Sequence, residues 1–496
     1  MTQVTLVHSP PHGEVPFRSI GLACLQAALL ARGHEAITID LSLEEDRSGN
    51  DFYGEYIGHL SERVGAMGDG PDPRILMEVV RPELFAELLP VSRTILRKVE
   101  HHLPRLLATE GPLLFTVNTL TVYFAAAMAS RLRAAGRRTA AGGPACTFPP
   151  LRNLLLRCGA FDAVVQGEGD LVVAPLVDAL CSLPTPSVPG ASWLEDGVVR
   201  SLPPVAPAAL DALPMPSFLG TDVHDFVPIL SSRGCPHRCS YCSEPSHWGC
   251  HRTRSPESVV AEMVERAGEY GCGDFHFHDD LINGDLAWLD RFTSLLIESG
   301  RGFRWESFCA PEGLSAARLG QMRRSGCVLL KLGVQSFSPR VLGLMGRPRN
   351  VSFARSAILD AARCGISMHF DMLTCFPGET DEDHRRNVET IEGIFAERSD
   401  VYFSPNPFYL SLGSATMLEP DRYGMRLIDF DPDTLPAPAA EVVRASGRFP
   451  VSFASPIPRE VVRQRLGELG GLLSRYGRDY LYLGKEKRDD GPARRS

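Results

Sequence analysis

The stretch that decides the fold of this chain is Arg233-Gly234-Cys235-Pro236-His237-Arg238-Cys239-Ser240-Tyr241-Cys242. It places three cysteines in the spacing Cys-x-x-x-Cys-x-x-Cys, with an aromatic residue directly before the last cysteine. Thiolates held this close on one loop can ligate three irons of a cubane [4Fe-4S] cluster. The fourth iron would then receive no ligand from the triplet and could bind a small molecule.

A zinc site is the main alternative explanation of the triplet. Structural zinc takes four ligands, usually as two pairs, and Cys250 and His251 follow closely enough to supply a fourth. The asymmetric triplet is seldom found among zinc spacings, which favours the cluster. Disulfides are disfavoured because the cysteines are crowded on one loop and nothing in the chain indicates export.

The triplet resembles that of the radical S-adenosylmethionine (SAM) enzymes. The resemblance implies that Cys235, Cys239 and Cys242 hold a [4Fe-4S] cluster whose open iron chelates the amino and carboxylate groups of SAM. It also implies that an electron from the cluster cleaves SAM to methionine and a 5′-deoxyadenosyl radical. A flavodoxin or ferredoxin would then be the outside reductant.

Length and composition indicate a globular enzyme of two or three domains. The chain has 496 residues, of which 44% are hydrophobic, and its net charge of -9 argues against general nucleic-acid binding. No apolar run approaches the roughly 18 residues that cross a bilayer, and no signal peptide is visible. The 13 cysteines favour a reducing, cytoplasmic location.

Residues 1–182 alternate short apolar runs with helical patterns, as a doubly wound, Rossmann-like parallel sheet does. Ligands bind such sheets outside the carboxyl ends of the strands. Residues 41–110 do not fit this alternation, so we expect them to form an inserted helical segment. The expected strands cover residues 4–7, 36–40, 113–117, 139–141 and 163–166.

This first domain resembles the cobalamin-binding domain that precedes many radical SAM barrels. The resemblance is carried by Pro10-Pro11, Ile20-Gly21-Leu22, Gly142-Gly143-Pro144-Ala145-Cys146-Thr147 and Asp162-Ala163-Val164-Val165-Gln166-Gly167-Glu168-Gly169. It implies that cobalamin contacts Gly142, Gly143, Gly167, Glu168 and Gly169, and that Thr116, Thr119 and Thr121 face its nucleotide tail. Glycine at such turns lets the backbone approach a ligand closely.

The cobalamin motif Asp-x-His-x-x-Gly, which supplies an axial histidine, is absent after the first strand. That position reads His8-Ser9-Pro10-Pro11-His12-Gly13, and Asp222-Val223-His224 has no glycine at the right place. We therefore expect cobalt to lack a histidine ligand from the protein. A flavodoxin-like domain that no longer binds cobalamin is the alternative, because glycine turns and hydroxyls are weak evidence by themselves.

Residues 183–222 are Pro-rich and are expected to connect two domains, with a hairpin that turns at Asp196-Gly197. Residues 223–410 should form a partial, TIM-like (β/α)6 barrel of the radical SAM type, whose chemistry lies on loops at the strand carboxyl ends. Residues 411–496 should form a small α-rich segment that closes the barrel and ends in a disordered charged tail. The six expected barrel strands cover residues 226–232, 274–278, 303–308, 328–335, 368–375 and 401–405.

Further motifs of the barrel resemble the SAM-contacting elements of the family. By this resemblance Asp279 lies near the SAM amino group, Gln335 or Ser336 bonds the ribose, and Tyr241 packs against adenine. Gly378 and Glu379 belong to the turn Phe376-Pro377-Gly378-Glu379-Thr380, which packs near adenine in the family. That turn is equally explained as the start of a helix.

The leading interpretation is a cobalamin-dependent C-methyltransferase acting on an unactivated carbon of a small biosynthetic intermediate. The resemblance implies that the 5′-deoxyadenosyl radical removes hydrogen, that methylcobalamin gives the methyl group, and that a second SAM remethylates cobalt. The alternatives are cyclisation, rearrangement or oxidation with the same cofactors, or a vestigial cobalamin domain.

Two other classes of protein fit the sequence less well. A tRNA methylthiotransferase normally carries further N-terminal cluster cysteines, whereas Cys24, Cys146 and Cys158 are scattered. A corrinoid-binding protein without catalytic activity has no need of an exposed cluster iron.

Overall fold

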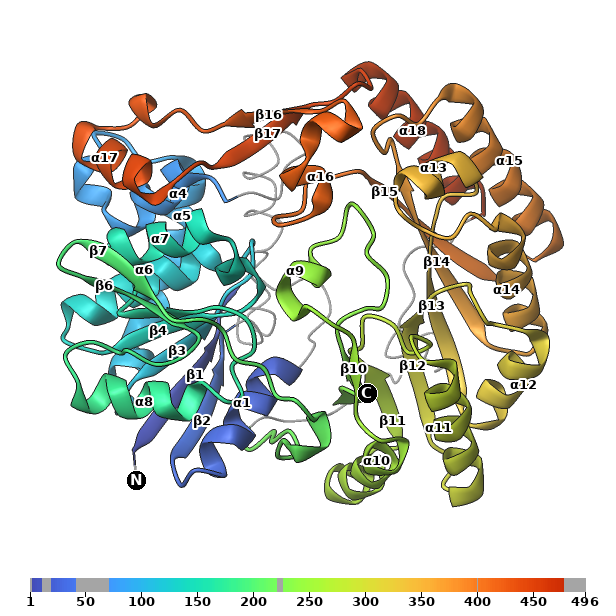
Figure 1. The fold of residues 1–496 in the computed structure, drawn as a ribbon, viewed down its shortest axis with the longest axis horizontal. Helices are drawn as coiled ribbons and strands as arrows, with labels where there is room; N and C mark the ends of the chain where they lie inside the picture. The colour runs from blue at the N-terminus through green and yellow to red at the C-terminus, as the bar shows by residue number, and fades with distance from the viewer. Residues whose placement is uncertain (1, 11–18, 42–70, 221–225, 399, 477–496) are drawn as a thin grey trace, which may run out of the picture.

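The structure is a computed structural model that describes residues 2–10, 19–41, 71–220, 226–398 and 400–476 (Figure 1). Two α/β bodies lie side by side, and C-terminal elements cross between them. Several features of the sequence lie outside the described residues, namely Pro11 to Gly13, residues 42–70 of the inserted segment, Asp222 to His224 and the charged tail.

The first body contains a seven-stranded sheet in the order β2-β1-β3-β4-β5-β6-β7. The first five strands are parallel and confirm the expected doubly wound sheet: β1 (Gln3–His8), β2 (Glu35–Asp40), β3 (Leu113–Thr116), β4 (Thr139–Gly142) and β5 (Ala163–Val165). The hairpin at Asp196-Gly197 forms β6 (Ala191–Glu195) and β7 (Val198–Ser201), which extend this sheet antiparallel to β5. Positive φ angles of 49° and 74° at the two turn residues match the twist of a two-residue hairpin.

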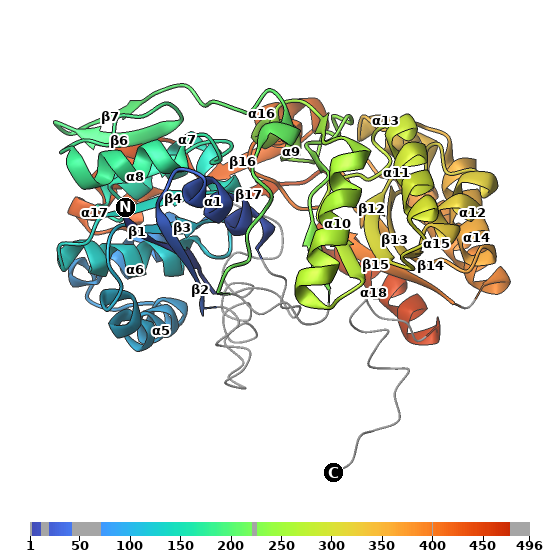
Figure 2. The same cartoon turned by 90° about the horizontal axis from the view of Figure 1, so that it is seen from below.

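Helices cover both faces of this sheet (Figure 2). One face carries α1 (Ile20–Leu30) and α8 (Val173–Ser182). The other carries α4 (Pro73–Val80), α5 (Pro90–Leu107), α6 (Val122–Ala134) and α7 (Pro149–Arg157). Adjacent strand residues alternate between the two cores, as Leu114 and Phe115 show, because strand side chains have a period of two. Strands buried on both sides explain why the sequence reads as continuous apolar runs.

The second body is the expected partial barrel. Its six parallel strands follow the order β15-β14-β13-β12-β11-β8, and β15 and β8 are not paired with each other. The strands are β8 (Val227–Ile229), β11 (Asp274–Phe277), β12 (Arg304–Cys309), β13 (Cys327–Gln335), β14 (Ser367–Thr374) and β15 (Val401–Pro407). The helices between them are α10 (Pro256–Tyr270), α11 (Leu286–Ser299), α12 (Ala316–Arg324), α14 (Val351–Arg363) and α15 (Asp381–Glu397).

A small hairpin marks where the cysteine loop leaves the barrel. Strands β9 (Ser232–Arg233) and β10 (Arg252–Thr253) pair antiparallel, and the loop between them contains the short helix α9 (Glu244–Trp248). Gly234 follows β9 with φ of 75°, and a Cβ there would lie 2.9 Å from the carbonyl oxygen of Cys250. Only glycine fits this close approach, so the chain turns sharply into the cysteine triplet.

The C-terminal elements cross from the barrel to the first body and return (Figure 1). The segment is mostly helical, as expected, and it also contains an antiparallel pair: α16 (Ala415–Leu418) is followed by β16 (Arg426–Asp429) and β17 (Pro450–Ala454), on either side of α17 (Ala437–Ser446). Helix α17 packs on the first body, where Phe449 meets the ring of Phe148 edge-on at 6.3 Å and Asn153 Nδ2 donates to the Ser446 carbonyl at 3.1 Å. Helix α18 (Arg459–Tyr476) then packs beside β15. In the part of the chain that the structure describes, no helix is long and apolar enough to span a bilayer.

The docking of the C-terminal segment gives a stability prediction. Phe449→Ala should lower the free energy of unfolding of the first body by about 3–5 kcal/mol, because the ring is 3% exposed and fills that core. Urea unfolding followed by fluorescence would measure the loss. Leu418→Ala, in the same segment but 67% exposed, is the control and should change stability by under about 0.5 kcal/mol. Equal effects of the two substitutions would contradict this packing.

Candidate active site

The three cysteines of the triplet line one cavity of about 400 Å³ at the mouth of the barrel. The cavity is also lined by the carboxyl ends of β13, β14 and β15, as expected for chemistry in a barrel of parallel strands. The remaining lining residues are His237, Tyr241, Glu244, Asp280, Leu281, Phe308, Cys309, Ala310, Gly333, Gln335, Arg347, Asp371, Leu373, Asn406 and Tyr409.

Hydrogen bonds from three directions hold the cysteine loop. The backbone N–H of Ser240 donates to the carbonyl of Met345 at 2.9 Å, and the carbonyl of Ser240 accepts from the N–H of Thr416 at 2.9 Å. The Arg347 guanidinium donates to Cys239 Sγ at 3.6 Å, to the Tyr241 hydroxyl at 3.3 Å and to the Gly333 carbonyl at 2.8 Å. The loop is therefore fixed to β13 and to the C-terminal segment, with a cation beside one thiol.

Two of the three thiols are thiolates only beside a bound cation, which either an iron-sulfur cluster or a zinc ion would provide. Burial raises the pKa of Cys235 to about 11 and of Cys242 to about 12, so these thiols need bound cations to become thiolates. Among the described residues, no three His, Cys, Asp or Glu side chains come close enough to hold one metal ion. Cys250, the fourth zinc ligand that the sequence offered, is exposed and does not line the cavity.

Of the residues expected to contact SAM, Tyr241 and Gln335 line this cavity. Gln335 has φ of 67°, which is rare for a residue with a side chain and marks a strained position. The pairing register of β13 with β14 shifts between Gly333 and Gln335, so the irregularity lies where the strand enters the cavity.

Asp279 does not line the cavity, and its neighbour Asp280 does. The carboxylate of Asp279 accepts hydrogen bonds from the Ser231 N–H at 3.2 Å, from the Ser231 hydroxyl at 2.8 Å and from the Ser232 hydroxyl. It therefore joins the ends of β8 and β11. Burial, together with the nearby Glu244, raises the pKa of Asp280 to about 7.

The other three expected SAM contacts support the loops around the cavity without lining it. Ser336 is buried and its hydroxyl donates to Asn387 Oδ1 at 3.2 Å. Glu379 accepts from the N–H of Cys375 at 2.7 Å, and the Gly378 carbonyl accepts from Arg340 at 2.6 Å. These contacts fit the alternative explanation, in which this turn starts helix α15.

A polar part of the wall of this cavity was missed by the sequence analysis. It is formed by Asp371 of β14 with Asn406 and Tyr409, which lie at and beyond the end of β15. Burial raises the pKa of Asp371 to about 6, against the opposing effects of Lys331 and Asn406. The available signal for this wall was an acidic residue between the apolar Phe370 and Met372 of an expected strand.

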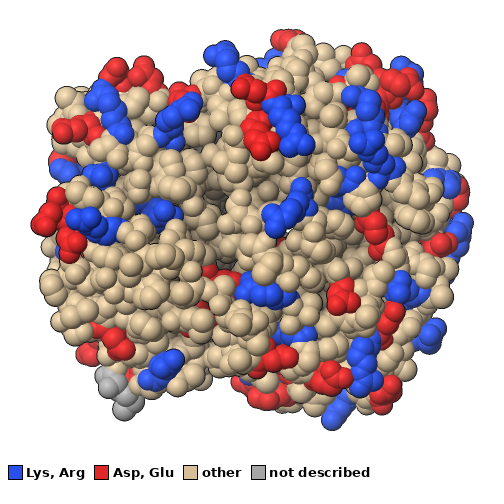
Figure 3. Space-filling view, viewed as in Figure 1, with Lys and Arg blue, Asp and Glu red and all other residues tan. Residues whose placement is uncertain are grey.

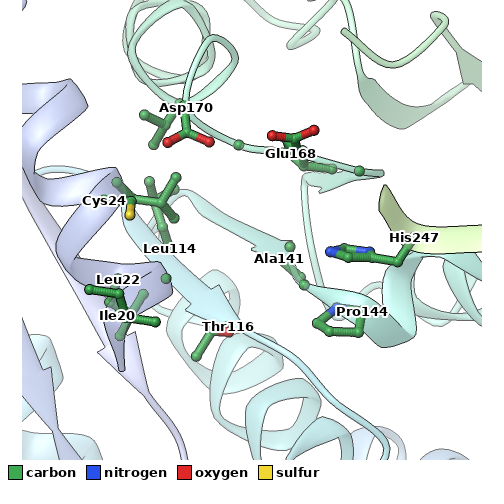
Figure 4. A pocket seen from close by; sticks show the side chains of 18 of the residues that line it. Ile20, Leu22, Cys24, Leu114, Thr116, Ala141, Pro144, Glu168, Asp170 and His247 are labelled. Carbon is green, nitrogen blue, oxygen red and sulfur yellow. The ribbon is translucent and has the colours of Figure 1, made fainter. Parts of the chain in front are cut away.

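A second cavity, of about 320 Å³, lies at the carboxyl ends of β3, β4 and β5 (Figure 4). Six of the eight residues expected to bind cobalamin line it, namely Thr116, Gly142, Gly143, Gly167, Glu168 and Gly169. Thr119 and Thr121 do not line it, because they belong to the turn that opens α6, where Thr121 Oγ1 accepts from the Asn118 N–H at 3.0 Å.

Gly143 of the second cavity occupies a position where a side chain does not fit. It has φ of 118°, and a Cβ there would lie 2.6 Å from the Val117 carbonyl oxygen. A Cβ on Gly169 would lie 2.7 Å from Leu25 Cδ2, so that the flexible leucine side chain would have to shift. The cavity is mostly apolar, and its glycine turns let a ligand approach the backbone closely, so we call it the glycine-walled cavity.

Arg233 links the loops that line the two cavities. Its guanidinium donates to Glu168 at 2.6 Å and to Asp170 at 2.6 and 2.9 Å, and all three side chains are less than 10% exposed. Arg252 also pairs with Glu168. In the sequence, Glu168 lies between Gly167 and Gly169 of the glycine-walled cavity, and Arg233 lies two residues before Cys235. One buried ionic group therefore connects the cofactor loop of the first body to the cysteine loop of the barrel.

The surface in the view of Figure 1 shows both signs of charge interspersed, with no broad field of one sign (Figure 3). In the same view, the molecular surface is hollowed between the two bodies.

Fold and sites together define a Rossmann-like domain joined to a partial barrel that carries the cysteine triplet. Residues 229–391, which include the triplet and most of the barrel, match the family model of the Radical SAM superfamily. The structure is similar to that of the radical SAM methyltransferase TsrM from Kitasatospora setae with cobalamin and a [4Fe-4S] cluster bound (TM-score 0.68, 17% identity, 95% of this chain and 91% of that chain). It is also similar to the cobalamin-dependent radical SAM enzyme OxsB (TM-score 0.58, 14% identity, 98% and 63% of the chains).

Curated relatives share part of the sequence. An uncharacterized methyltransferase of Pyrococcus horikoshii is 30% identical over 274 residues, which cover 53% of this chain and 58% of the relative. The cytidylyl-2-hydroxyethylphosphonate methyltransferase of Streptomyces wedmorensis is 24% identical over 338 residues (58% and 61%). The chain spans less than two thirds of the length of either relative. These comparisons confirm the predicted resemblance to cobalamin-binding radical SAM enzymes.

The ionic group around Arg233 gives a second prediction. Arg233→Met leaves Asp170 buried without its cation and should cost about 3–5 kcal/mol, visible as a lowered midpoint of thermal unfolding. Asp170→Asn in the same chain should recover part of the loss. Arg385→Met is the control, because its pair with Glu382 is exposed (59% and 63%) and should be worth under about 1 kcal/mol. A loss that Asp170→Asn does not relieve would show that packing, not charge, holds this junction.

The raised pKa of Asp371 predicts a pH-dependent effect on stability. The folded carboxyl has a pKa of about 6 and the unfolded one about 4, so its burial costs nothing below pH 4 and most above pH 6. Asp371→Asn should therefore stabilise the cofactor-free protein at pH 8, by up to about 3 kcal/mol, relative to its effect at pH 4. Urea unfolding at both pH values would measure this. A pH-independent effect would show that folding does not change the pKa of this carboxyl.

Proposed function

We propose that this protein is a cobalamin-dependent radical SAM enzyme, most simply a C-methyltransferase that acts on an unactivated carbon of a small biosynthetic intermediate. One observation carries the proposal: the cavity lined by the cysteine triplet and the glycine-walled cavity share the helix α9, which contributes Glu244 to the first and His247 to the second. This supports two sites that act on one substrate.

Each cavity offers residues for a defined part of this chemistry. Cys235, Cys239 and Cys242 would hold the [4Fe-4S] cluster, and Tyr241, Gln335 and Asp280 would position SAM beside it. The glycines at residues 142–143, 167 and 169 would admit the cobalamin tail. When bound, these cofactors supply hydrogen abstraction and a methyl group, which leaves orientation and the exclusion of water and oxygen to the protein.

The polar wall of the barrel supports a small, functionalised substrate. Asp371, Asn406 and Tyr409 line the barrel cavity and offer carboxylate, amide and hydroxyl groups for orientation. The net charge of -9 and the interspersed surface charges favour such a substrate over RNA. The reductant would be a flavodoxin or ferredoxin, and 13 cysteines favour a cytoplasmic location.

Loss of one cluster thiol is the first test. Cys239→Ala should keep the fold but abolish cleavage of SAM to 5′-deoxyadenosine, a loss of at least about 100-fold, because two thiols cannot hold the cluster. The assay is anaerobic, with dithionite and protein reconstituted with iron and sulfide. Cys250→Ala removes an exposed cysteine of the same loop and should retain cleavage. Normal 5′-deoxyadenosine formation by Cys239→Ala would defeat the assignment.

Product analysis separates methylation from its alternatives. Protein reconstituted with cobalamin and supplied with candidate intermediates should consume two SAM for each product that gains a methyl mass. Cyclisation, rearrangement or oxidation would add no methyl mass. Failure of the purified protein to bind cobalamin would leave only hydrogen abstraction and would contradict the methyltransferase.

A further inference from the structure

The cysteine loop is held on its outer side by two short helices, α16 and α13 (Pro339–Leu344). Ser240 of the loop contacts both of them. Its carbonyl accepts from the Thr416 N–H of α16 at 2.9 Å, and its hydroxyl donates to the Leu344 carbonyl of α13 at 3.3 Å. The surface over these two helices and the loop is therefore the outside of the wall that holds the thiols.

This surface has an apolar centre. Leu344, the last residue of α13, is 38% exposed, and Leu418, the last residue of α16, is 67% exposed. A single exposed leucine is ordinary on a protein surface. Two of them at the ends of the two helices that hold one loop form a small apolar patch, of the size that a weak, transient protein contact uses.

Arginines lie beside the apolar centre. Arg238 and Arg349 are exposed, and neither forms an ion pair with any residue that the structure describes. A Cβ on Gly346 would lie 3.3 Å from the Arg238 carbonyl oxygen, and a Cβ on Gly343 of α13 would lie 2.5 Å from Arg349 Nε. Both arginines thus belong to the surface around α13, where Lys and Arg side chains gather in Figure 3.

The other charges of the two helices change this local sign little. Arg340 of α13 pairs with Asp383, and Arg422 pairs with Glu419 at 3.1 Å. Asp421, just after α16, is exposed and acidic. Unpaired positive charge therefore remains beside the cysteine loop, although the whole chain has a net charge of -9. Such a spot attracts an acidic partner and orients it during the encounter.

The same surface is close to the thiols along the chain. Arg238 directly precedes Cys239 in the sequence, and the Arg347 guanidinium, two residues before Arg349, donates to Cys239 Sγ at 3.6 Å. Electron transfer slows steeply with distance, so an electron donor must dock where few atoms separate the protein surface from the acceptor.

We propose that the surface formed by Arg238, Leu344, Arg349 and Leu418 is the docking site of the electron donor, and that this donor is an acidic flavodoxin. The inference rests on the proposed function, because it requires a cluster on the triplet. The edge of the flavin ring is apolar and fits the leucine centre, whereas acidic side chains around it would face the two arginines. One electron passes: the flavin hydroquinone anion becomes the neutral semiquinone, the cluster charge falls by one unit, and no proton moves.

Binding of oxidised recombinant flavodoxin to the cluster-loaded protein tests the surface, measured by isothermal titration calorimetry at low ionic strength. Arg238→Glu combined with Arg349→Glu should raise the dissociation constant at least about tenfold, because two attractions become repulsions. Leu418→Ala should raise it roughly fivefold through lost apolar contact. High salt should weaken binding of the wild-type protein, since exposed charges are screened.

Arg324→Glu is the matched charge-reversal control. Arg324 is exposed, forms no ion pair among the described residues, and lies three residues before β13, at the end of the barrel away from the thiols. Its substitution should leave the affinity for flavodoxin unchanged. Cleavage of SAM driven by reduced methyl viologen, a small reductant that needs no docking surface, should be retained in Arg349→Glu and in Leu418→Ala.

The remaining outcomes overturn the inference in distinguishable ways. Absence of flavodoxin binding, or binding that none of these surface substitutions weakens, would refute the site. A ferredoxin that binds here in place of flavodoxin would refute the flavin carrier. If the double variant holds no cluster, Arg349→Glu and Leu418→Ala decide, because both residues lie outside the cysteine loop. A wild-type protein that cleaves no SAM with methyl viologen would refute the proposed function as well, whereas normal cleavage without flavodoxin binding would refute this inference alone.

Discussion

The structure depends on a buried ionic junction between Arg233 of the barrel and Glu168 and Asp170 of the first body. Burying these charges is unfavourable unless all of them meet, because an unpaired ion in the interior loses its hydration without compensation. The cofactor loop and the start of the cysteine loop therefore adopt their positions together. With Arg252 as the second cation, two positive and two negative groups balance at this junction.

Both sheets direct their functional residues to the same region. Parallel strands bring all carboxyl ends to one edge, and in each body that edge holds the loops that matter. In the first body these loops are rich in glycine and form a slot, whereas in the barrel they carry thiols, carboxylates and amides. The helix α9 lies between the two and takes part in both, since Glu244 lines one cavity and His247 the other.

The features that the sequence predicted well depend on local patterns. The cysteine spacing, the glycine turns and the strands are all encoded by neighbouring residues, and the structure has each strand within a few residues of its expected position. Asp279 and Asp280 show the limit: adjacent strand-end residues point in opposite directions, and sequence cannot tell which one meets the ligand. Arg233 lies 65 residues from Glu168, and Asp371 and Asn406 meet only because β14 pairs with β15, so these groupings required the fold.

The docking of α17 on the first body has a consequence for biosynthesis. The last strand of the first sheet ends at residue 201, but Leu435, Val443 and Phe449, which complete its larger core, are translated more than 200 residues later. At about 5–20 residues per second, the ribosome needs roughly 10–50 s to deliver them. During that interval the nascent first domain exposes an apolar surface, so its final burial waits for the end of translation and makes the newly made chain a natural client of chaperones.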